Sequence, residues 1–83
     1  MNGTLNDIAV GERAVVTQLT AQDGMRGRLL DIGFTCGARV RCLFAAPSGE
    51  PRAYLIRGAV IALRREDADT VHVRTRKEAQ TWD

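Results

Sequence analysis

Hydrophobic and polar residues alternate in five short stretches of the chain, and this pattern predicts five β-strands. Val, Ile, Thr and aromatic residues are common in these stretches, and residues that favour turns lie between them. The predicted strands span residues 14–19, 39–44, 52–57, 60–63 and 70–74. Two prolines exclude segment 47–51 from any central strand and predict a protruding loop. Short strands joined by tight turns predict a mainly β fold, a small five-stranded barrel.

A different periodicity predicts one short helix at residues 25–32, inserted after the first predicted strand. Its apolar stripe, at i, i+4 and i+7, consists of Met25, Leu29 and Ile32. The preceding pair, Asp23 and Gly24, is suited to cap the start of the helix. Gly33 stands where a left-handed residue ends a helix, and Phe34 can then contact Leu29.

The same patterns predict which side chains form the hydrophobic core. Strict alternation along 39–44 places Val40, Cys42 and Phe44 on one face and two arginines on the other. The full predicted core consists of Leu5, Val15, Leu29, Ile32, Val40, Phe44, Ile56, Leu63 and Val73.

The length of 83 residues is that of one domain, expected over 1–75 with a mobile tail at 76–83. No run reaches the ~18 apolar residues of a membrane helix, and the first residues lack the features of a signal peptide. The sequence therefore predicts a cytosolic protein.

The formal net charge of +2 is unevenly distributed along the chain. Between Arg26 and Arg65 there are eight arginines but only two acidic residues, Asp31 and Glu50, a local balance of 8 − 2 = +6. Arginine favours forked contacts with carboxylate or phosphate groups. The alternative is an ordinary solvated surface.

The sequence offers no recognisable set of catalytic or metal-binding residues. His72 is the only histidine, nucleotide-binding loop motifs are absent, and Asp67 and Asp69 fall beside a turn. Cys36 and Cys42 do not have the spacing of a redox motif, so free thiols are expected, with Cys36 the more exposed. We therefore predict a binding protein with no catalytic residues, no bound cofactor and no metal site.

Several short motifs in a fixed order resemble the FeoA family of small proteins of bacterial ferrous iron uptake. They are Gly11, the Arg-x-Arg-Leu-Leu-x-x-Gly helix at 26–33, Gly37-x-x-Val40, the Pro-containing turn at 46–51, the block at 58–64 and Val71-x-Val73. The chain departs from the family at Cys36, where proline is usual. The resemblance implies an SH3-like barrel, a fold that also occurs as the C-terminal domain of iron-dependent repressors. It also implies a partner, the FeoB-type membrane transporter with its cytosolic GTP-binding domain.

The favoured hypothesis is an accessory protein that docks on this GTP-binding domain and reaches the inner membrane only through that partner. The predicted contact residues are Met25, Arg26, Arg28, Leu29 and Leu30. Alternatively, the 47–51 loop buries Leu30, and the arginines pair with Asp31 or Glu50.

Two other functions remain possible from the sequence. A small nucleic-acid-binding barrel would explain the positive charge, but the chain is poor in aromatic residues for base stacking. A metal chaperone would need several nitrogen and oxygen ligands for iron(II), and one histidine with scattered acids is a poor set.

Overall fold

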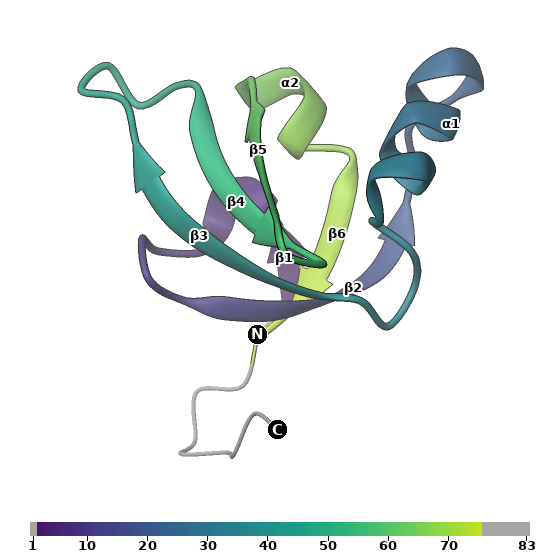
Figure 1. The fold of residues 1–83 in the computed structure, drawn as a ribbon, viewed down its shortest axis with the longest axis horizontal. Helices are drawn as coiled ribbons and strands as arrows, with labels where there is room; N and C mark the ends of the chain where they lie inside the picture. The colour runs from purple at the N-terminus through teal and green to yellow at the C-terminus, as the bar shows by residue number, and fades with distance from the viewer. Residues whose placement is uncertain (1, 76–83) are drawn as a thin grey trace.

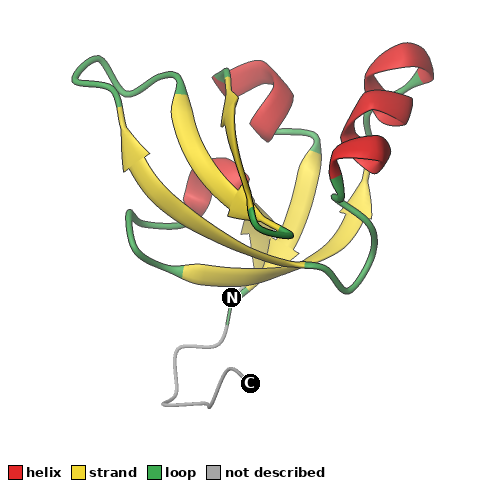
Figure 2. Cartoon of the chain, viewed as in Figure 1, coloured by secondary structure: helices red, strands yellow, loops and turns green. Residues whose placement is uncertain are grey.

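A computed structural model describes residues 2–75, so the predicted tail at 76–83 lies outside the described residues. Six antiparallel strands form one sheet in the order β1-β6-β2-β3-β4-β5. The sheet bends around a common interior (Figure 1). Helices stand at its periphery, and the longest, α1, lies at one side of the strands (Figure 2). No helix among the described residues is long and apolar enough to cross a membrane.

All five predicted strands are present, and the structure adds a sixth at the N-terminal end. The strands are β1 (Asn2–Thr4), β2 (Arg13–Leu19), β3 (Arg39–Ala45), β4 (Arg52–Ile56), β5 (Ala59–Leu63) and β6 (Val71–Arg74). The helices are the 3₁₀ turn η1 (Leu5–Asp7), α1 (Asp23–Ile32) and the single turn α2 (Arg65–Ala68). The prediction of five strands was wrong because β1 is too short to show alternation and forms by pairing with β6. The main helix therefore follows the second strand.

The hydrophobic core forms between the sheet and the elements at its edges. Six of the nine predicted core residues are buried: Leu5, Leu29, Val40, Ile56, Leu63 and Val73. Ile32 is partly buried against this cluster. Tyr54, which the prediction omitted, is the largest fully buried side chain among the described residues.

The predictions of Val15 and Phe44 as core residues were wrong for one shared reason. A β-bulge interrupts the register of β2 between Val16 and Gln18, and another interrupts β3 between Cys42 and Phe44. Each extra residue reverses the alternation of inward and outward side chains. Phe44 is consequently 59% exposed, and Val15 is half-buried between the inward Ala14 and Val16.

The ends of α1 differ in how well the sequence predicts them. The helix begins at Asp23, and its N-cap residue Gln22 makes no side-chain capping bond, so the predicted Asp23-Gly24 cap was wrong. The predicted stop at Gly33 is confirmed, since its amide and that of Phe34 both donate to the Leu29 carbonyl at 3.1 and 3.0 Å. Gly33 has a φ of 130°, and a Cβ there would lie 2.7 Å from Cδ of Arg57. The positive φ favours glycine at this position, whereas the exposed Arg57 side chain can move away from an added Cβ.

Candidate functional site

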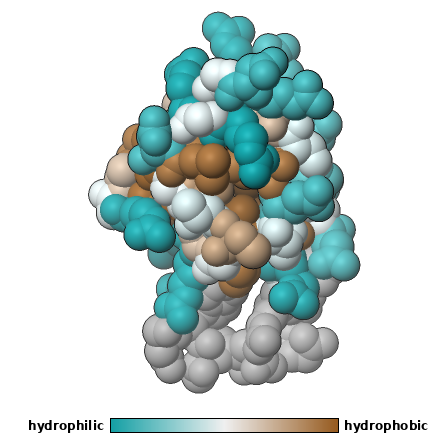
Figure 3. All heavy atoms as spheres, turned by 90° about the vertical axis from the view of Figure 1, so that its right-hand side faces the viewer, coloured by the Kyte–Doolittle hydropathy of each residue, from teal (hydrophilic) through white to brown (hydrophobic). Residues whose placement is uncertain are grey.

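The helix α1 is the element least covered by the rest of the described chain. Leu29 is its single buried residue, while Met25 and Ile32 pack partly against the core. A surface helix normally buries a wider apolar stripe than this. On the side of the molecule that carries α1, hydrophobic residues gather among hydrophilic ones (Figure 3).

The five predicted contact residues have different environments. Leu29 is 1% exposed, so it fixes the helix to the core and cannot itself touch a partner. Leu30 is 37% exposed, and Met25 is half-buried. Arg26 donates through Nη1 to the Leu19 carbonyl at 2.9 Å, which ties the helix to the end of β2. Arg28 is exposed and has no hydrogen bond or ion pair within residues 2–75.

The alternative in which the 47–51 loop covers Leu30 is wrong. This loop joins β3 and β4 on the far side of the barrel from α1 (Figure 1). Glu50 in the loop accepts a hydrogen bond from the Arg65 amide at 2.7 Å and forms no ion pair with α1. Leu30 thus remains accessible on the helix surface.

The accessible contact residues do not form one continuous patch. Successive residues turn by about 100° around a helix, so Arg26 and Leu30 project about 40° apart. Arg28 projects about 160° from Leu30, on the flank shared with Met25 and Ile32. The helix therefore presents two flanks, one carrying Leu30 and the other Arg28, with Leu29 between them.

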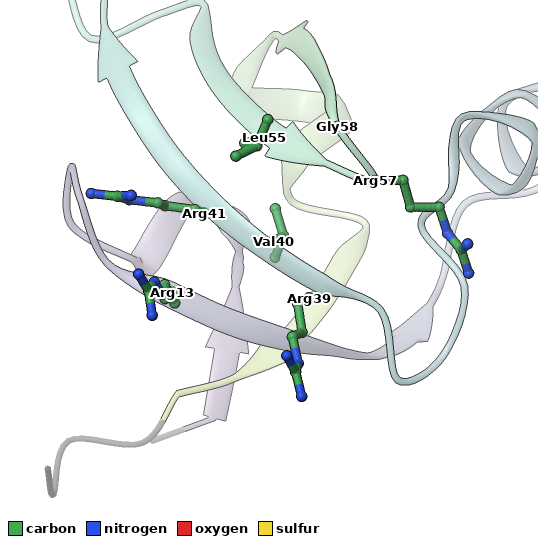
Figure 4. Close-up of a pocket in the computed structure, with 7 residues that line it drawn as sticks. All are labelled: Arg13, Arg39, Val40, Arg41, Leu55, Arg57 and Gly58. Carbon is green, nitrogen blue, oxygen red and sulfur yellow. The ribbon is translucent and has the colours of Figure 1, made fainter. Parts of the chain in front are cut away.

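A second surface, which the predicted contact set missed, is a hollow of about 290 Å³ on the barrel. Its lining consists of Arg13, Arg39, Val40, Arg41, Leu55, Arg57 and Gly58. The four arginines come from β2, β3 and the β4–β5 turn (Figure 4). The uneven charge of the sequence was the signal for this surface, but strand pairing is needed to see which arginines meet.

Arg52 differs from these surface arginines because it is part of the internal structure. Its guanidinium donates to the carbonyls of Leu5 at 3.2 Å, Asn6 at 3.1 Å and Ile8, and lies 3.2 Å from the Cys42 sulfur. It also lies over the Tyr54 ring, 5.8 Å from the centroid. These contacts hold the η1 turn against β3 and β4, so Arg52 belongs to the fold.

Other candidate chemistry is sparse in the described part of the chain. Among residues 2–75, no group of three or more His, Cys, Asp or Glu side chains could hold a metal ion. His72 is half-buried on β6 between the buried Val71 and Val73. What stands out instead is exposed surface suited to binding: the two flanks of α1 and the arginine-lined hollow.

The two thiols are predicted to react at very different rates. Both cysteines are free, Cys36 exposed and Cys42 buried, which confirms the expected difference in exposure. A disulfide reagent added to the folded protein should label one thiol rapidly and the second only after denaturation. The variant Cys36→Ser should lose the rapid phase, whereas rapid labelling in that variant would contradict the burial of Cys42.

Comparison with known proteins decides the family. The model of the FeoA domain matches residues 3–75 of the chain. The chain belongs to the FeoA family. The expected family is therefore confirmed.

One curated relative of this FeoA-family chain is a fusion protein. It is the Fe(2+) transport protein A/Fe(2+) transporter FeoB fusion protein of Porphyromonas gingivalis, 32% identical over 69 residues. The match covers 83% of this chain and 8% of the fusion protein, so the chain spans a small part of that relative.

Solved structures confirm the expected fold. The FeoA protein of Chlorobium tepidum is 30% identical with a TM-score of 0.82, over 96% of this chain and 80% of that one. The FeoA of Stenotrophomonas maltophilia, solved with zinc and described as an SH3 domain protein, is 33% identical with a TM-score of 0.73, over 86% and 88%. A manganese-dependent transcriptional repressor has a TM-score of 0.79 at 20% identity, over 89% of this chain and 41% of that one, which shows a shared fold alone.

Proposed function

We propose that this FeoA-family chain is a non-catalytic accessory protein of ferrous iron uptake that docks on the cytosolic GTP-binding domain of a FeoB-type transporter. The observation that carries the proposal is the Porphyromonas gingivalis relative, which joins Fe(2+) transport protein A and transporter FeoB in one polypeptide. Fusion keeps two domains at a high effective concentration, which is useful when they act together. In this proposal the chain works at the cytosolic face of the inner membrane.

The helix α1 is the docking element in this proposal. Leu30 is accessible on one flank, and on the other Arg28 stands beside the partly buried Met25 and Ile32. Arginine and methionine are enriched at protein interfaces, and arginine is common among the residues that contribute most to binding. Leu29 anchors this helix from below.

Two variants test the proposal, one on each flank of α1. Leu30→Gln removes the exposed apolar side chain, and Arg28→Glu reverses a charge that has no partner within residues 2–75. Each is expected to weaken binding to the isolated GTP-binding domain by about tenfold, or about 1.4 kcal/mol, measured by calorimetry. Arg28 is preferred to Arg26 because Arg26 also holds the Leu19 carbonyl.

Matched controls separate docking from general surface effects. Val10→Gln changes an apolar side chain that is 56% exposed away from α1, and Arg64→Glu reverses an exposed charge beside α2. Both should bind like the natural chain. Unchanged affinity in both α1 variants, with folding intact, would exclude the helix as the docking element. Loss of affinity on one flank alone would assign the contact to that flank.

A further inference from the structure

The outward face of strands β2 to β5 combines arginines with apolar side chains in register. Arg13 pairs with Arg41, Arg41 with Leu55, and Leu55 with Val60, so these four residues form one row across the strands. Arg39 lies two positions from Arg41 on β3 and therefore projects from the same face. We call this surface the arginine face.

The bulge in β3 adds an aromatic side chain to the arginine face. Because the bulge follows Cys42, Phe44 pairs with Ala53, which lies on the same outward side as Leu55. Phe44 and Val60 are each 59% exposed. Two of the large hydrophobic side chains exposed in the described structure thus stand beside the arginines.

Three of the four arginines in the hollow have no acidic partner among residues 2–75. No acidic residue lines the hollow, and Arg13, Arg41 and Arg57 form no ion pair within residues 2–75. Arg13 and Arg41 stand directly opposite each other, and like charges at paired positions destabilise a sheet. An anionic ligand would relieve this repulsion.

The directions of the side chains distinguish between kinds of anion. In Figure 4 the guanidinium groups spread away from one another around Val40 and Leu55, with Arg41 and Arg57 pointing to opposite sides. They do not converge on one point, as a site for a single phosphate or carboxylate would require. They can instead meet separate anionic groups distributed over a broad surface.

We propose that the arginine face binds the surface of a bilayer containing anionic phospholipids. Arg13, Arg41 and Arg57 would each contact lipid phosphates, and Phe44 and Val60 would enter the headgroup region. Nucleic acid is less suitable because, among residues 2–75, Phe44 is the one aromatic side chain exposed on this face, which leaves little base stacking. The chain would thus reach the membrane without a partner, unlike the expectation from its sequence, and this binding does not require docking on a transporter.

Vesicle sedimentation of the full chain, without any transporter, tests this inference. Binding is expected to vesicles that contain phosphatidylglycerol and not to pure phosphatidylcholine, and it should weaken as salt screens the charges. Arg13→Gln and Arg41→Gln should each weaken binding about fivefold. Phe44→Ser should also weaken binding while leaving its salt dependence intact.

Control variants and competitors make the outcomes distinct. Arg64→Gln removes an arginine outside the hollow and should bind like the natural chain, as should Val10→Ser. Equal binding to both vesicle types, or equal effects of Arg41→Gln and Arg64→Gln, would overturn the proposal. If a single-stranded oligonucleotide binds more tightly than lipid and displaces the chain from vesicles, the face would be reassigned to nucleic acid. The same result with polyglutamate would reassign it to an acidic protein.

Discussion

Replacing Arg52 with methionine is expected to lower the free energy of unfolding by about 3 kcal/mol, because three partly buried carbonyls each lose the donor that Arg52 provides. The guanidinium donates to the carbonyls of Leu5, Asn6 and Ile8, and it also covers the Tyr54 ring. Methionine fills similar space but provides no hydrogen-bond donor. Urea unfolding followed by circular dichroism measures the change.

The matched control is Arg64→Met, the same substitution at an exposed site. Its expected effect is within about 0.5 kcal/mol, as is usual for surface positions. Arg52→Lys should fall between the two variants, since one ammonium group cannot reproduce the fork that reaches three carbonyls. A loss for Arg52→Met no larger than for Arg64→Met would refute the role of Arg52 in holding η1.

Stability is also expected to fall by up to about 2.7 kcal/mol as the pH rises from about 10 to about 12. Burial raises the pKa of Tyr54 to about 12, although the nearby Arg52 lowers it. The folded state therefore favours the neutral phenol over the tyrosinate. This contribution is complete below the unfolded pKa of about 10 and is lost as the pH rises through the folded value.

Two measurements isolate this effect. Tyr54 is the only tyrosine, so the ultraviolet absorbance of tyrosinate reports its titration directly. The variant Tyr54→Phe loses the 3.2 Å hydrogen bond that the hydroxyl donates to the Leu5 carbonyl. This loss should lower the free energy of unfolding by about 1 kcal/mol near neutral pH. In the same variant, the part of the stability decrease at high pH that comes from Tyr54 ionisation should be absent. A tyrosine titrating near pH 10 in the folded protein would contradict its burial.

The fold was predictable wherever local signals and tertiary packing agree. Gly33 ends α1 where the sequence places it, and the five predicted strands are present. Strict alternation failed at the two bulges, because an extra residue such as that between Cys42 and Phe44 leaves no mark in the hydrophobic pattern. Partner strands decide where the register shifts, so the sequence of one strand cannot reveal it.

The candidate site was predictable in part for the same reason. The helix and the separation of Arg28 from Leu30 follow from periodicity, but the exposure of Leu30 and the bond from Arg26 to the Leu19 carbonyl depend on tertiary structure. The arginine face joins Arg13 to Arg41, far apart in the sequence, and so depends on strand pairing. Charge alone could not distinguish these arginines from Arg52, whose guanidinium serves the core.

The central claim, that α1 docks on a transporter's GTP-binding domain, is tested most directly by mapping the contact residue by residue. The isotope-labelled chain is titrated with the unlabelled domain, and its amide resonances are followed by nuclear magnetic resonance. We expect the largest changes within α1 (Asp23–Ile32), with little change in the 47–51 loop on the far side of the barrel. Saturable resonance changes confined to other elements would contradict this docking site. The absence of any resonance change at a saturating concentration of the GTP-binding domain would contradict it as well.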